Sequence, residues 1–373
     1  MDSIINHTAF FVISKGKPGG AERRFYYLYE HFINKNKLPY LITNSELFDS
    51  LSPDSLSKKN VFKTRLNCYG VFGSLKYILD TLRYIRNNNI KHVHFCVNPS
   101  VYSFLMINIL KLFGCTTSVS IVNSIIRQKA DLPRINRFFW RKTIQSVNHI
   151  DVLSPSIKKN MINLFGSVIF PDHKVSISAC SFSMRSDFLS KDKRCNGNVD
   201  NRPYDFLFAS RLIEGKGLEL LLDTLKMCDE EGHKIVVGVC GVGPLAEKVK
   251  DLNFNYVQLK YLGYIKNMHE ILFLSKVALS LQRYENYPSQ FLLEALAANC
   301  HIISTDVGDT RLLLNDDIAT LIESDVISLK DALLNITYDC STQRIGTVKN
   351  VLNMHTVDTF SKYIERSVLG AKF

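Results

Sequence analysis

The strongest constraint on the fold is a regular alternation of short β-branched or aromatic segments with longer helical patterns. The series begins with a strand-like AFFVIS at residues 9–14, followed by a helix-like AERRFYYLYEHFINKN at residues 21–36. This alternation predicts right-handed βαβ units on a parallel sheet. The expected strands of this first series are residues 9–14, 38–43, 91–97, 116–122, 149–154 and 173–178.

A break in the alternation predicts two domains. The segment SKDKRCNGNVDNRP, residues 190–203, is polar and rich in turn-forming residues, as is typical of a linker. A second series follows, with expected strands at residues 204–210, 234–240, 256–263, 277–281 and 301–306. A chain of 373 residues also exceeds what one hydrophobic core usually supports.

We therefore expect an α/β protein with two doubly wound parallel-sheet domains. The first covers residues 1–190 and the second residues 191–356, and a last helix in residues 357–373 packs back on the first domain. Ligands of such sheets bind at the carboxyl ends of the strands. Two such domains therefore predict a site in a central cleft that both face.

Cysteine usage and hydropathy favour a cytoplasmic location. The nine cysteines are scattered without a C-x-x-C pair, which argues against a disulfide framework or a zinc site. Residues 1–16 lack the basic region of a signal peptide and are expected to contain the first strand. The most apolar segment, residues 102–114, is too short for a hydrocarbon core about 30 Å thick, so a buried helix is expected there.

The charge is divided unevenly between the two halves of the chain. Residues 1–190 hold 25 Lys and Arg against 11 Asp and Glu, a net +14, whereas residues 191–373 hold 21 against 24, a net −3. The first half is therefore expected to lie near an anionic membrane surface, a nucleic acid or a phosphorylated substrate.

Two glycine motifs follow expected strands. Gly19 and Gly20 precede a helix, where backbone N–H groups and the helix dipole attract phosphate. Gly241 and Gly243 follow another strand, with Pro244 at the expected first helical position. A tight turn without a ligand explains the first motif equally well, and it is favoured as the explanation of the second.

Two cations, Arg211 and Lys216, lie between the first strand of the second domain and its helix. Placed beside a helix N-terminus, they suit a diphosphate. The alternative is that both are solvated loop charges.

The segment RYENYPSQFLLEALAANC, residues 283–300, places Glu294 in an otherwise apolar helix. None of its same-face neighbours is basic, so Glu294 either meets a cation from elsewhere in the chain or binds a ligand. Pro288 is expected at the first helical position, leaving the N–H groups of Ser289 and Gln290 for an anion.

Taken together, the early glycine pair, SRLIEGKG, GVGP, LGYI and ENYPSQFLLEALAANCHIISTDVGD resemble the retaining glycosyltransferases of family 4, which have the two-domain GT-B fold. The resemblance implies that Arg211 and Lys216 hold the diphosphate of a UDP- or GDP-sugar, without a metal or other cofactor. It also implies that Glu294 binds the ribose and Glu285 the donor sugar. The other candidates for donor binding are Gly19, Gly20, Gly243, Tyr264, Asn286 and Ser289.

The chain departs from the family pattern in two places. The two acids are separated by eight residues instead of seven, so either Glu285 or Asn286 occupies the place of the first acid. Asn123 and Ser124 stand where many members have a histidine after the fifth strand. His94 is a candidate on the acceptor side, with a buried core histidine as the alternative.

A basic aromatic segment, RINRFFWRKTIQ at residues 134–145, predicts an amphipathic helix that docks on anionic membrane. The alternative places Phe138 and Trp140 in the core and leaves the cations in solvent.

These features predict a metal-independent hexosyltransferase in surface polysaccharide or lipopolysaccharide synthesis. Its expected acceptor is a glycan or a polyprenyl-diphosphate-linked glycan, and its expected location is the cytoplasm or the inner face of the cytoplasmic membrane. A nucleotide-sugar epimerase of the same fold and a non-catalytic nucleotide- or nucleic-acid-binding protein are the alternatives. The binding alternative predicts basic and aromatic residues interleaved on a sheet face, a pattern that the sequence does not show, so no nucleic-acid partner is expected.

Overall fold

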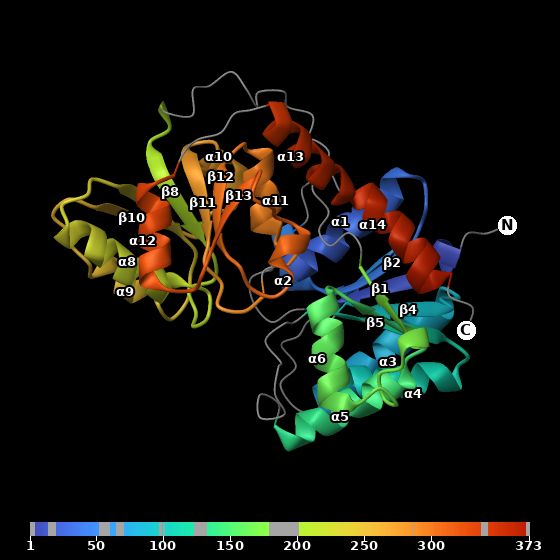
Figure 1. Ribbon diagram of the computed structural model, residues 1–373. Coiled ribbons are helices and arrows are strands. Elements are labelled where there is room, and N and C mark those ends of the chain that lie inside the picture. The colour runs from blue at the N-terminus through green and yellow to red at the C-terminus, as the bar shows by residue number, and fades with distance from the viewer. Residues whose placement is uncertain are drawn as a thin grey trace. The chain divides into compact units, whose positions relative to one another are not determined.

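A computed structural model describes residues 4–13, 20–51, 60–64, 71–96, 99, 101–122, 133–178, 201–285, 287–336 and 342–370. The chain divides into two compact units (Figure 1). Unit 1 comprises residues 1–183 and 356–373, and unit 2 comprises residues 184–355.

Unit 1 contains a seven-stranded parallel sheet with the order β3-β2-β1-β4-β5-β6-β7. The strand order reverses between β1 and β4, where Phe10 lies opposite His94. The strands are β1 (Thr8–Val12), β2 (Tyr40–Asn44), β3 (Val61–Thr64), β4 (His92–Phe95), β5 (Thr116–Ile121), β6 (His149–Val152) and β7 (Val175–Ile177).

The main helices of unit 1 come from both ends of the chain. They are α1 (Gly20–Asn34), α2 (Ser45–Leu51), α3 (Val71–Asn87), α4 (Val101–Leu112), α5 (Arg134–Ser146), α6 (Pro155–Phe165) and α14 (Val357–Tyr363). Shorter helical turns are η1 (Ile4–His7), η3 (Asp172–Lys174) and η6 (Ile364–Leu369). The C-terminal α14 lies against α1, and the rings of Phe25 and Phe360 meet there with centroids 5.9 Å apart.

Unit 2 contains a six-stranded parallel sheet with the order β10-β9-β8-β11-β12-β13. The order reverses between β8 and β11, the place where ligands of doubly wound sheets bind. The strands are β8 (Tyr204–Ala209), β9 (Val236–Cys240), β10 (Gln258–Gly263), β11 (Ser275–Ser280), β12 (His301–Thr305) and β13 (Ala319–Ile322).

The helices of unit 2 pack around this sheet, with α13 against α11. They are α8 (Leu218–Glu230), α9 (Ala246–Lys250), α10 (Met268–Leu272), α11 (Gln290–Ala297), α12 (Val326–Leu334) and α13 (Thr342–Met354), with the short turn η5 (Thr310–Leu312). Leu221 and Leu225 of α8 pack in one core with Val237 and Val277 of the sheet. Helices α8 and α12 lie side by side in Figure 1, and Leu329 of α12 belongs to the same core.

The predicted α/β class and GT-B fold are confirmed by the two parallel sheets and by the structural comparisons given below. Two edge strands, β3 and β13, were not predicted. Each is short and only partly buried, so neither has the continuous apolar run of a central strand. Within the described residues, no helix combines the length and hydropathy needed to cross a membrane.

Candidate functional site

The loops that follow β8 and β11 lie beside the reversal point of the sheet in unit 2. Arg211 comes two residues after β8 and is exposed, whereas Lys216 is half-buried. The Lys216 Nζ donates a hydrogen bond to Gln282 Oε1 over 2.6 Å. Burial, followed by the nearby Arg211 guanidinium, lowers the pKa of Lys216 to about 8. The loop therefore holds a cation whose ammonium form is less stable than that of a free lysine.

A close backbone contact fixes this loop. Gly217, the N-cap of α8, has φ 89°, a left-handed conformation that favours glycine. A Cβ at this position would lie 2.0 Å from the carbonyl oxygen of Leu281. The N–H of Arg283 also donates to the carbonyl of Gly215 over 3.0 Å. Lys216 therefore lies directly against the segment that follows β11.

Gly243 serves a similar packing purpose after β9. A Cβ there would lie 2.3 Å from the carbonyl oxygen of Leu212, so only glycine permits this approach to the loop that carries Arg211. The prediction that Pro244 occupies the first helical position was wrong. Helix α9 begins at Ala246 with Leu245 as its N-cap, because the N–H of Leu245 donates a hydrogen bond to the carbonyl oxygen of Leu212.

Tyr264 follows β10 directly after Gly263, at the same edge of the sheet. Its side chain is 41% exposed.

Glu285 is buried, and its carboxylate binds backbone N–H groups. Its Oε1 accepts from the N–H of Tyr287 at 2.9 Å and from that of Asp309 at 3.1 Å. A Cβ at Gly308 would lie 2.4 Å from Oε2, so the loop after β12 wraps closely around this carboxylate. The alternative first-acid position, Asn286, lies outside the described residues.

Glu294 is half-buried on α11 and accepts a hydrogen bond from Gln290 Nε2 at 2.8 Å. Ser289 is the N-cap of this helix, and its Oγ accepts from the N–H of Leu292. The expectation that Pro288 begins the helix was wrong, because the Ser289 cap starts the helix at Gln290. The first-turn N–H groups therefore belong to Gln290 and the residue after it.

In unit 1, Gly20 is the first residue of α1, and Gly19 lies outside the described residues. His94 is fully buried in β4, where its Nδ1 lies 2.7 Å from Ser118 Oγ and its Nε2 lies 3.0 Å from Ser120 Oγ. Burial holds the pKa of His94 well below its usual value. Both ring nitrogens are bonded to serine hydroxyls inside the core, and this placement matches the alternative of a hydrogen-bonded core histidine.

A buried polar network continues across the neighbouring strands. The Asp151 carboxylate accepts hydrogen bonds from Ser120, Ser178 and Tyr363, and it lies 3.8 Å from Arg24 Nη2. The guanidinium of Arg24 also stacks on the ring of Phe360, 3.9 Å from its centroid. This network connects α1, the sheet and the C-terminal segment, and was not predicted. Polar residues at every second position of β5 and β6 are its only sequence signal.

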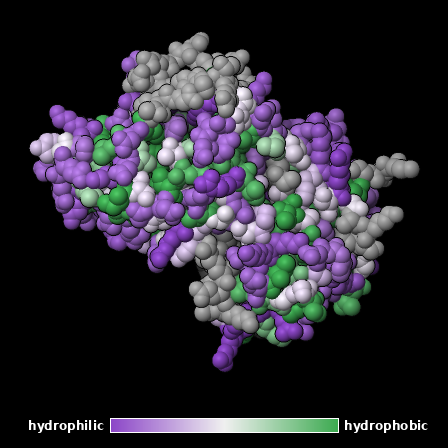
Figure 2. All heavy atoms as spheres, viewed as in Figure 1, coloured by the Kyte–Doolittle hydropathy of each residue, from purple (hydrophilic) through white to green (hydrophobic). Residues whose placement is uncertain are grey.

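Helix α5 divides its aromatic residues between core and surface. Trp140 is buried and stacks on Phe165 with centroids 6.4 Å apart, whereas Phe138 and Ile135 are 52% and 66% exposed. The cations Arg134, Arg141 and Lys142 are exposed beside them. Figure 2 shows hydrophobic and hydrophilic side chains intermixed over α5 and α6.

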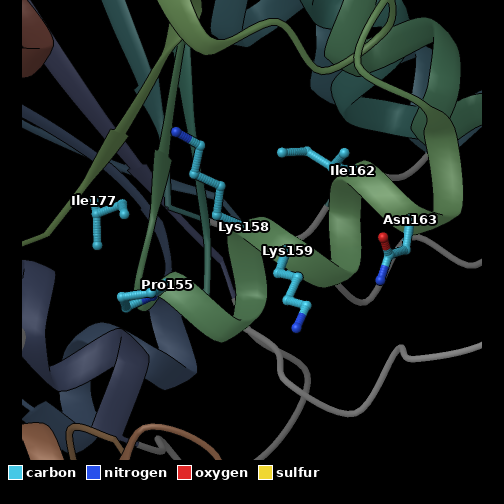
Figure 3. A pocket seen from close by; sticks show the side chains of 6 residues that line it. All are labelled: Pro155, Lys158, Lys159, Ile162, Asn163 and Ile177. Carbon is cyan, nitrogen blue, oxygen red and sulfur yellow. The ribbon is translucent and has the colours of Figure 1, made fainter.

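A shallow groove of about 220 Å³ lies on α6 of unit 1 (Figure 3). Lys158 binds Asp172 over 2.7 Å, whereas Lys159 extends along the other side of the helix in Figure 3. The groove therefore combines cations with an apolar floor. Its lining residues are Pro155, Lys158, Lys159, Ile162, Asn163 and Ile177.

Comparison with known proteins finds a family and several solved structures to which this chain is similar. Residues 190–341 match the family model described as Glycosyl transferases group 1. No curated protein matches the chain. The solved structure of HepE from Anabaena in complex with UDP and glucose has a TM-score of 0.71 at 14% identity, covering 97% of this chain and 99% of that one.

Two further solved structures show the same fold. Sucrose-phosphate synthase from Thermosynechococcus elongatus has a TM-score of 0.72 at 14% identity, with coverage of 98% and 100%. The lipopolysaccharide outer core galactosyltransferase WaaB has a TM-score of 0.65 at 14% identity, with coverage of 98% and 99%. The chain thus has the GT-B fold, and its residues 190–341 are similar to the glycosyltransferase group 1 domain.

Proposed function

We propose that this protein is a metal-independent, retaining hexosyltransferase that moves a sugar from a UDP- or GDP-sugar to a glycan. The observation that carries the proposal is the half-buried Lys216, held by the neutral amide of Gln282 at the reversal point of unit 2. No carboxylate of the described residues forms an ion pair with this ammonium. A site of this kind attracts a phosphate-bearing ligand.

The chemistry that we propose is stabilisation of a departing nucleoside diphosphate. Negative charge grows on the diphosphate as the bond to the sugar breaks, and Arg211 and Lys216 stabilise that charge without a metal. Glu294 accepts hydrogen bonds from the ribose hydroxyls. Glu285 shapes the sugar end of the site, where its carboxylate already holds the loop around Gly308.

Donor binding and turnover test this proposal. UDP, GDP and ADP, each with its sugars, are compared by thermal shift, since a ligand at 100 times its dissociation constant stabilises by about 2.7 kcal/mol. Transfer is then followed with and without EDTA, and the anomeric configuration of the product is read by NMR. Interconversion of two nucleotide sugars would favour the epimerase, and binding without donor hydrolysis would favour a non-catalytic protein.

The acceptor that we propose is a glycan on a polyprenyl diphosphate, presented to unit 1 at an anionic membrane of the cytoplasmic face. Lipopolysaccharide or another surface polysaccharide is the corresponding product. Support comes from the net +14 of residues 1–190 and from the exposed Ile135 and Phe138 beside Arg134 and Arg141 on α5. Each such cation contributes about 1 kcal/mol near an anionic leaflet.

Vesicle binding tests the membrane proposal. The protein should bind anionic vesicles, bind neutral ones weakly, and leave both at high salt. The double change Arg134→Glu and Arg141→Glu should abolish binding, and Phe138→Ser should weaken it. The matched control, Lys226→Glu with Lys234→Glu, changes two exposed lysines of unit 2. Equal loss of binding in the control would show that net charge alone is responsible.

A further inference from the structure

Gln282 joins two loops of the candidate site. It follows β11 by two residues, is half-buried, and its Oε1 accepts the 2.6 Å hydrogen bond from Lys216 Nζ across 66 residues of sequence. Its backbone carbonyl in turn accepts from Thr305 Oγ1 over 2.7 Å. The end of β12 therefore anchors Gln282, and Gln282 anchors the lysine.

The other groups around this contact either form hydrogen bonds with other partners or carry positive charge. Arg211, on the same loop as Lys216, adds a like charge and does not accept hydrogen bonds. The Glu285 carboxylate holds the N–H groups of Tyr287 and Asp309. The amide oxygen of Gln282 is thus the acceptor that the structure gives to the ammonium.

We propose that Gln282 is a positioning residue, whose amide oxygen holds the Lys216 ammonium at the place where the donor diphosphate binds. This inference rests on the proposed function. A neutral acceptor suits the task because it fixes the ammonium without cancelling its charge. A carboxylate in the same place would neutralise the lysine and repel the diphosphate.

Two substitutions should move the titration of Lys216 in opposite directions. Gln282→Leu removes the acceptor, so the buried ammonium becomes less stable and its pKa falls. Gln282→Glu adds a negative charge beside the ammonium, so its pKa rises. Both changes should nevertheless weaken UDP binding at pH 7, the first by loss of orientation and the second by repulsion.

The experiment combines two measurements on the full chain. NMR of ¹³C-methylated lysines follows the titration of Lys216 in the absence of ligand, with Lys216→Arg to assign the signal. Calorimetry gives the dissociation constant for UDP at pH 7. We expect midpoints that differ by about one pH unit or more between the two variants, on either side of the wild-type value. We also expect a dissociation constant raised roughly tenfold in each variant, as for a lost hydrogen bond to a charged group.

Gln258 provides a matched control. It is exposed at the start of β10, and Gln258→Leu and Gln258→Glu should leave both measurements unchanged. Weaker UDP binding in both Gln282 variants without movement of the Lys216 midpoint would show a merely structural role and overturn the inference. Unchanged binding would overturn it as well. If the wild-type protein binds none of UDP, GDP and ADP, the proposed function fails and the inference fails with it, even where the midpoints move.

Discussion

The affinity for UDP should fall as the pH rises through 8, and Lys216→Arg should remove that fall. Burial, followed by Arg211, lowers the pKa of Lys216 to about 8. The ammonium is then about nine-tenths populated at pH 7 and about one-tenth populated at pH 9. If only this form holds the diphosphate, the dissociation constant rises roughly tenfold between these two pH values. The sign is fixed because a bound anion favours the protonated lysine, so binding above pH 8 takes up a proton.

Calorimetry from pH 6.5 to 9.5 at constant ionic strength measures this dependence. The arginine variant keeps its charge throughout this range and should give a flat profile, because the guanidinium pKa exceeds about 12. Lys216→Met should bind weakly at every pH. Titration of UDP itself is common to all three proteins and therefore cancels in the comparison. A flat wild-type profile, or the same slope in the arginine variant, would refute the assignment of Lys216 to the diphosphate.

Three further predictions concern stability and are measured by urea unfolding. Glu285→Ala should lower the free energy of unfolding by about 2 kcal/mol or more, because two buried N–H groups lose their acceptor, and Glu285→Gln should cost less because one oxygen remains. Tyr363→Phe should cost about 1–3 kcal/mol, since the buried Asp151 carboxylate loses a donor, and an unchanged midpoint would contradict this. Gly217→Ala should destabilise by at least about 1 kcal/mol through its left-handed φ and the contact with Leu281, in contrast to Gly346→Ala, where the space is open.

The sheets were predictable because central strands are buried on both faces. Strands β1, β5 and β11 consist largely of buried residues, and their apolar or β-branched runs stand out from the amphipathic helices between them. The edge strands β3 and β13 lack that signal, because both are only partly buried. The strand order then brings the loops after β8 and β11 together at the carboxyl ends of the strands, where the alternation predicts that a ligand binds.

The contacts within the site were less predictable, because they join residues distant in sequence. Gln282 has no motif of its own, and only the folded chain brings it to Lys216. Likewise, Ser289 and Pro288 both suit a helix start, and the choice depends on which one the preceding loop can place at the cap. His94 was ambiguous for the same reason: its partners, Ser118 and Ser120, lie on the adjacent strand and cannot be recognised from the local sequence.

The buried Arg24 and the half-buried Lys216 show how a cation balanced within the protein differs from one that is not. Arg24 lies against the carboxylate of Asp151 and the ring of Phe360, so its charge is balanced within unit 1. A cation balanced in this way attracts a further anion only weakly. Removing it would leave a buried carboxylate without its counter-charge and would lower the free energy of unfolding by about 3–5 kcal/mol. Lys216 has a neutral amide as its partner and Arg211 as its charged neighbour, an arrangement that disfavours its own charge. Such a lysine lowers the free energy of unfolding of the ligand-free protein at neutral pH, and its charge becomes favourable only when an anion binds. This asymmetry is the strongest physical reason to place the diphosphate beside it.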